Sequence, residues 1–100
     1  MEISIQEMDG RTVAILSGEF DTAAAPEAEQ ALSPLPEQAD RDILIDCTKL
    51  EYIASSGLRI LLNIVKKAKA AGKRVILKGV NDVIREVLEL TGFIKLFDFE

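Results

Sequence analysis

Two serines and a glycine, Ser55-Ser56-Gly57, stand where an amphipathic helix follows a buried strand, and their types and position point to phosphate chemistry. In α/β proteins, ligands and modifications gather at the loops that leave the carboxyl ends of strands. A helix N-terminus there offers unpaired backbone N–H groups and the positive end of the helix dipole, and both favour a phosphate. The pattern therefore predicts a phosphorylation switch. The alternative is that Ser55 or Ser56 is only the N-cap of the helix.

Other kinds of site have less support in this sequence. It contains no histidine, so the usual general base for a serine nucleophile and the commonest metal ligand are both missing. Cys47 is the only cysteine, which excludes an internal disulfide, and we expect it to be buried in a strand. We predict no catalytic residue, no metal and no cofactor. Two alternatives stay open: an enzyme with Ser56 as nucleophile, and a nucleotide or small-ligand module that uses the short anion nest at Ser55-Ser56-Gly57.

Length and charge narrow the class of protein. The chain has 100 residues, which fits a single domain over residues 1–100, and its net charge is −5. The negative charge disfavours nucleic acid and anionic membrane as partners, because both require a basic footprint. No apolar run is long enough to span a membrane and the first residues do not begin a signal peptide, so we expect a cytoplasmic protein. Five basic residues flank the end of the predicted long helix: Lys66, Lys67, Lys69, Lys73 and Arg74. We interpret them as cations that complement the negative end of the helix dipole.

The elements that must position the two serines follow from periodicity and turn residues. Alternating residues at Ile3 and Ile5, then Asp9-Gly10, predict a hairpin with the strand around 13–16. A helix from about Pro26 to Leu32 follows, ended by Pro34 and Pro36, and then a central strand from Ile43 to Cys47. A long helix from about Ser56 to Ala71 leads to a strand over residues 75–77. The third helix is capped by Asn81 or Asp82 and ended by Gly92, and an apolar tail from Phe93 to Phe99 completes the prediction. The segment from Ile43 to Leu77 is a β-α-β unit, which requires parallel strands.

Apolar spacing predicts which helix faces are buried. On the long helix, Ile60 and Ile64 flank the polar stripe, where they are either covered by the domain or extend an apolar patch for a partner. On the third helix, the expected inner side is Val80, Ile84, Val87, Leu88 and Thr91. We expect the apolar tail to cover the core as a short strand or a helix-sheet cover, with a partner surface as the alternative.

Three segments together resemble a known family. The pattern Asp46-Cys47-Thr48-x-Leu50-x-Tyr52-Ile53-x-Ser55-Ser56-Gly57-Leu58 resembles the signature of anti-sigma factor antagonists, the bacterial STAS domains. Gly18-Glu19-Phe20-Asp21 before a proline-initiated helix is similar to the family's second motif, and residues 87–93 resemble its last helix and turn. The resemblance spans nearly the whole chain in the right order. It implies an α/β fold: a STAS-like single domain with a mixed four- to five-stranded sheet and packed α-helices.

The resemblance also implies a function. In such proteins the unphosphorylated domain binds an anti-sigma factor that is a serine kinase, and this frees a sigma factor for transcription. The kinase phosphorylates the serine before the motif glycine, here Ser56, and a serine phosphatase restores the unphosphorylated form. We expect the protein to be a monomer when it is not bound to a partner, and not to be an enzyme. The alternative from another class is a STAS regulatory or accessory subunit of another system, such as a lipid transporter.

The residues expected to bind the partner lie around Ser56. They are Asp21, Thr22, Ser55, Ser56, Gly57, Leu58 and Arg59. Arg59 is one turn along the helix and could reach a phosphate, and Gly57 would leave the approach to Ser56 open. The alternatives are that Asp21 is only a turn or cap residue and that Arg59 is an ordinary solvated side chain. Many family members carry an acidic residue where this chain has Ala54.

Overall fold

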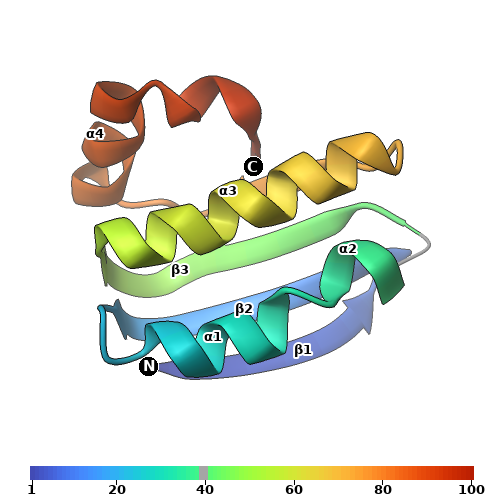
Figure 1. Ribbon diagram of the computed structural model, residues 1–100, viewed down its shortest axis with the longest axis horizontal. Helices are drawn as coiled ribbons and strands as arrows, with labels where there is room; N and C mark the ends of the chain where they lie inside the picture. The colour runs from blue at the N-terminus through green and yellow to red at the C-terminus, as the bar shows by residue number, and fades with distance from the viewer. Residues whose placement is uncertain (39–40) are drawn as a thin grey trace.

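The chain forms one five-stranded mixed sheet with helices packed against it (Figure 1). The computed structural model describes residues 1–38 and 41–100. The strands lie in the order of the sequence, β1-β2-β3-β4-β5; β1 and β2 are antiparallel and the other neighbours are parallel. The elements are β1 (Glu2–Met8), β2 (Arg11–Phe20), α1 (Ala25–Leu32), α2 (Leu35–Gln38), β3 (Ile43–Ile53), α3 (Ser55–Ala70), β4 (Val75–Lys78), α4 (Asp82–Thr91), the 3-10 helix η1 (Phe93–Leu96) and β5 (Asp98–Phe99). The predicted fold class is confirmed.

The hairpin between β1 and β2 is the one that Asp9-Gly10 predicts. Met8 pairs with Arg11, so only two residues form the loop. Both have positive φ, 53° at Asp9 and 74° at Gly10, as a type I′ turn requires. This turn twists with the strands and fixes the register of β1 on β2.

The end of β3 differs from the prediction. We expected the strand to stop at Cys47 before a short loop, but it continues to Ile53, and only Ala54 separates it from α3. The register of β3 against β2 shifts twice, once after Asp46 and once after Leu50. Such irregularities insert extra residues into one strand and interrupt the alternation of buried and exposed positions. The prediction therefore missed this half of the strand, where Leu50 and Ile53 are buried and the residues between them are exposed.

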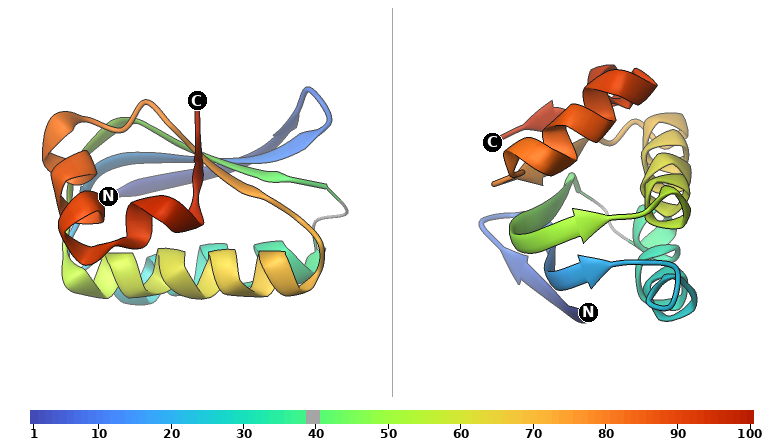
Figure 2. Two further views of the ribbon diagram at one scale, coloured as in Figure 1. Left: turned by 90° about the horizontal axis from the view of Figure 1, so that it is seen from above. Right: turned by 90° about the vertical axis from the view of Figure 1, so that its left-hand side faces the viewer.

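Helices α1, α2 and α3 cover one face of the sheet (Figure 2). The core between them contains Leu16, Phe20, Ile45 and Leu61, all buried. Ile60 and Ile64 are buried as well, so the domain covers them and they do not extend an apolar patch. The prolines at 34 and 36 do end α1 at Leu32, and a one-turn helix, α2, follows, because proline is tolerated in the first turn of a helix.

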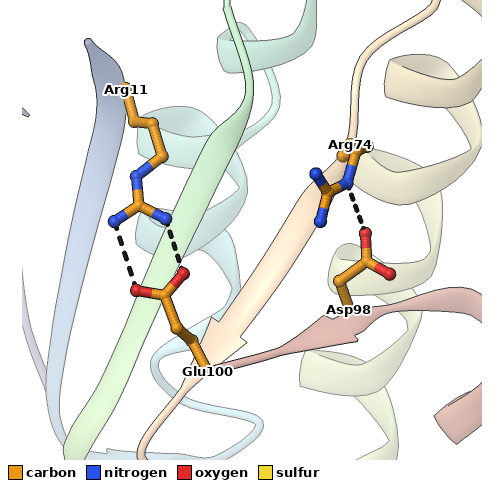
Figure 3. A network of polar contacts seen from close by, with 4 residues as sticks. All are labelled: Arg11, Arg74, Asp98 and Glu100. Carbon is orange, nitrogen blue, oxygen red and sulfur yellow. Dashed lines mark hydrogen bonds and ion pairs between the residues drawn. The ribbon is translucent and has the colours of Figure 1, made fainter. Parts of the chain in front are cut away.

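The opposite face of the sheet carries ion pairs over a small apolar cluster. Val13, Leu44 and Ile76 lie side by side on β2, β3 and β4 and are buried. The Arg11 guanidinium donates to both carboxylate oxygens of Glu100, at 2.6 and 3.2 Å, and Figure 3 shows this pair in front of β3. A second pair, Arg74 to Asp98 at 2.7 Å, lies beside it (Figure 3). Leu44 of the central strand is thus buried without a helix on this side.

The last helix begins and ends where the sequence predicts. The Asn81 side chain accepts a hydrogen bond from the Ile84 N–H at 2.8 Å, and Gly92 ends α4 with φ at 78°. Thr91, which we expected on the inner side, is exposed. Its hydroxyl donates to the Val87 carbonyl at 2.9 Å, so it finds its partner on its own helix.

The apolar tail packs on the core, as expected. Phe97 is buried, and Phe93, Ile94, Leu96 and Phe99 pack against the core while remaining partly accessible. The Phe93–Leu96 segment forms η1, and Asp98–Phe99 adds β5 to the edge of the sheet beside β4.

Candidate functional site

The N-terminus of α3 lies directly against the ends of β2 and β3. Ala54, in extended conformation, is the N-cap, and its N–H donates to the Phe20 carbonyl at 2.8 Å. The first backbone bond of the helix runs from the Leu58 N–H to the Ala54 carbonyl at 3.0 Å. The N–H groups of residues 55–57 therefore have no acceptor within the helix. No side chain caps α3, so the alternative that Ser55 or Ser56 serves as its N-cap is wrong.

The two serines differ in their surroundings. Ser55 is exposed, whereas the Ser56 Oγ is buried and makes no hydrogen bond within the described part of the chain. It is the one buried side-chain polar atom of the described residues with this property. A buried hydroxyl without a partner costs about 1–3 kcal/mol. No hydrogen bond to a described residue holds it in place.

Gly57 faces the core and not the approach to Ser56. A Cβ built on Gly57 would lie 2.8 Å from Phe20 Cδ1 and 2.9 Å from Ile53 Cγ1. The expectation that Gly57 opens the path to Ser56 is therefore wrong. The glycine allows the first turn of α3 to pack closely on Phe20, and Leu58 is buried next to it. Gly57 and Leu58 therefore set the position of the first turn of α3, and both are too buried for a partner to contact directly.

An open groove of about 690 Å³ lies between α1 and α3, and Ser56 is one of its lining residues. Thr22 lines the groove ahead of α1, and Arg59 and Asn63 line it from α3. Arg59 is exposed and forms no ion pair with any described residue. The structure thus brings Thr22, Ser56 and Arg59 to one surface. The groove residues of α1, among them Glu29 and Gln30, were not predicted from the sequence. Asn63 was not predicted either, but it lies four residues after Arg59 on the same side of α3, and this spacing could have indicated it.

Asp21 forms the turn that leads into α1. Its Oδ1 accepts a hydrogen bond from the Ala24 N–H at 2.9 Å, so the role of a turn residue is confirmed. Asp21 directly follows Phe20, whose carbonyl is bonded to Ala54, and it therefore lies close to the start of α3. Its side chain is half-buried.

Two neighbouring groups in the first half of β3, Cys47 and Asp46, have shifted pKa values. Burial raises the pKa of Cys47 to about 12, with a smaller contribution from Asp46, so the thiol is not a nucleophile. Burial also acts to raise the pKa of Asp46, but hydrogen bonds from the Thr48 side chain and N–H outweigh it, and the pKa is lowered. The described residues contain no group of acidic, cysteine or histidine side chains that could hold a metal ion. None of the described helices is long and apolar enough to cross a membrane.

Comparison with known proteins shows the family of this chain. The family model described as "Mlab, STAS domain" matches residues 3–98. The chain belongs to the STAS domain family. Among its relatives is BtrV of Bordetella bronchiseptica, a candidate anti-sigma factor antagonist, which is 30% identical over 97% of this chain and 84% of BtrV.

Solved structures have the same STAS fold. An anti-sigma factor antagonist from Mycobacterium paratuberculosis is 30% identical over 98% of this chain and 83% of that one, with a TM-score of 0.83. SpoIIAA, an anti-sigma factor antagonist, has been solved unphosphorylated, at 21% identity over 99% of this chain and 87% of its own, with a TM-score of 0.78. The structure of phosphorylated SpoIIAA, from Bacillus, is 22% identical over 99% of this chain and 91% of its own, with a TM-score of 0.77.

Proposed function

We propose that this STAS domain is an anti-sigma factor antagonist whose binding to an anti-sigma factor serine kinase is switched off by phosphorylation of Ser56. The observation that carries the proposal is the Ser56 hydroxyl, which is buried without a partner at the uncapped N-terminus of α3. No hydrogen bond with a described residue compensates for the cost of burying this hydroxyl. In this proposal the protein is a cytoplasmic monomer when free and catalyses no reaction itself.

The transfer step takes place on the partner. The Ser56 side chain turns its hydroxyl out into the groove, and Oγ bonds to the γ-phosphorus of ATP while the bond between that phosphorus and ADP breaks. The hydroxyl proton passes to a base of the kinase. Because no hydrogen bond with a described residue holds Oγ in its buried position, the turn to solvent breaks no such bond.

The phosphate has a ready environment in this domain. It adds roughly −1.5 to −2 charges, which the free N–H groups and the helix dipole at the start of α3 favour. Arg59 is three residues along, on the same side of the helix, and its guanidinium is exposed in the same groove. The fold is therefore expected to survive phosphorylation. The partner would be excluded by the new charge and bulk at the groove.

The contact surface of the proposal consists of accessible residues around the groove. Asp21, Thr22, Ser55, Ser56 and Arg59 would touch the partner. Gly57 and Leu58 would act indirectly, because both are buried and set the position of the first turn of α3. A serine phosphatase acting on the phosphorylated form would restore binding.

The test is affinity capture from host lysate with three baits: Ser56→Ala, Ser56→Glu and the matched control Ser55→Ala. We expect Ser56→Ala and Ser55→Ala to retain a kinase-like anti-sigma factor and Ser56→Glu to lose it. Equal recovery by all three, repeated with genuine phosphoserine at position 56, contradicts the switch. Recovery of a transporter subunit in place of an anti-sigma factor would favour the alternative of a STAS accessory subunit, which shares the fold.

A further inference from the structure

Helix α4 exposes an apolar stripe that only partly packs against the core. The helix packs on the domain through Ile84 and Leu88, which are buried. Val83 and Leu90 are 57% and 80% exposed, the two highest values among the large apolar side chains of the described residues. Together with the half-buried Val87 they are spaced by four and three residues, so they line one side of the helix. We call Val83, Val87 and Leu90 the α4 stripe.

An acidic row runs along the α4 stripe. Asp82, Glu86 and Glu89 each precede a stripe residue by one position, so the row repeats with the same spacing on the solvent side. All three are exposed, and none forms an ion pair with another described residue. The Arg85 guanidinium, the one cation of this helix, lies 5.0 Å from the centre of the Phe99 ring and is thereby directed toward β5.

Spacing and charge together define what would fit this surface. Apolar residues at intervals of four and three match the seam between two packed helices. The acidic row calls for lysine or arginine beside the apolar residues of the partner. A second copy of this chain is disfavoured, because it would bring two acidic rows together in a protein with a net charge of −5.

Helix α4 lies at the same end of the molecule as the start of α3 (Figures 1 and 2). The Asn81 side chain, which caps α4, donates to the carbonyls of Leu50 and Glu51 on β3, a few residues before Ser55. One partner can therefore reach both surfaces. We propose that the α4 stripe is a second docking site for the anti-sigma factor, which binds it through an amphipathic helix bearing basic residues. This inference rests on the proposed function.

Titration calorimetry with the purified cognate anti-sigma factor tests the inference. The double variant Val83→Ser/Leu90→Ser should weaken binding about tenfold or more, because it removes the two most exposed apolar side chains of the α4 stripe. Glu86→Lys should also weaken binding and reduce its dependence on salt. The matched controls on β1, at the far edge of the sheet, are Ile5→Ser and Glu2→Lys, which should bind like the wild type. All substituted residues are exposed, so the thermal midpoints should stay close to that of the wild type.

The outcomes separate this inference from the proposed function. If the wild type binds the anti-sigma factor and the double variant binds equally well, the α4 stripe is not a docking site and the proposed function stands. If the wild type does not bind it at all, both fall. Sedimentation of the domain alone gives a further check: a wild-type dimer that the double variant abolishes would mean that the stripe joins two copies, and would overturn the inference.

Discussion

Replacing Ser56 with alanine is expected to stabilise the domain, although the substitution removes the proposed switch. The Ser56 Oγ is buried without a hydrogen-bond partner among the described residues, which costs about 1–3 kcal/mol. Alanine removes this penalty and adds a helix-propensity gain of about 0.5 kcal/mol. Ser55 precedes Ser56 in the same helix turn and is exposed, so Ser55→Ala offers only the propensity gain. The difference between the two alanine variants therefore isolates the buried hydroxyl and should be about 1–3 kcal/mol.

The assay is urea denaturation of the wild type, Ser56→Ala and Ser55→Ala, followed by circular dichroism at one pH and one salt concentration. We expect a higher midpoint for Ser56→Ala with an unchanged slope, since the surface exposed on unfolding stays the same. Thermal unfolding should show the same order, with about 4–8 °C for each 1 kcal/mol in a domain of this size. If Ser56→Ala is no more stable than Ser55→Ala, the hydroxyl has a hydrogen bond in solution and the reasoning is refuted.

Four further predictions follow from single features. Gly57→Ala should lower the free energy of unfolding by about 1 kcal/mol, because overpacking of about 2 kcal/mol exceeds a propensity gain of about 1 kcal/mol; a stabilised variant in urea would contradict this. Ala54→Asp should add an N-cap to α3, which denaturation should detect as a gain of about 1 kcal/mol in the free energy of unfolding. The new carboxylate should also occupy the free N–H groups and slow phosphorylation in a kinase assay. Faster phosphorylation would refute this prediction. The Cys47 thiol, with a pKa of about 12, should resist alkylation at pH 8 until the domain unfolds, and rapid labelling of native protein by mass spectrometry would count against its burial. The hydrogen bond from Arg11 lowers the pKa of Glu100, so Glu100→Gln should have a lower free energy of unfolding than the wild type at neutral pH. This difference in the free energy of unfolding should disappear as the pH falls through the folded pKa of that carboxyl. A difference that persists in acid would exclude this cause.

Much of this fold could be predicted because local signals and tertiary packing agree. Asp9-Gly10 specifies a two-residue hairpin, and Asn81 and Gly92 mark the ends of α4. Each of these signals depends on residues close together in the sequence. The second half of β3 was missed because its bulges depend on the register against β2, which a sequence pattern of period two does not reveal.

The candidate site was predictable in its position but not in its details. The strand–helix junction and its two serines stand out in the sequence, and they do lie at a helix N-terminus. The contacts of Gly57 with Phe20 and Ile53, however, join residues from three elements. The burial of the Ser56 hydroxyl depends on the same packing. Features of this kind follow from tertiary distances and have no signature in the spacing of residue types.

The central claim is that one phosphate on Ser56 decides whether this domain binds its anti-sigma factor. The most direct measurement is the dissociation constant for the purified anti-sigma factor, determined by calorimetry for the unphosphorylated domain and for the domain with phosphoserine installed at position 56. We predict that the phosphate weakens binding by at least about tenfold, because it places like charge or uncompensated charge at the interface. Circular dichroism and the thermal midpoint of the phosphorylated domain should still be those of a folded protein. Equal dissociation constants for the two forms would contradict the account.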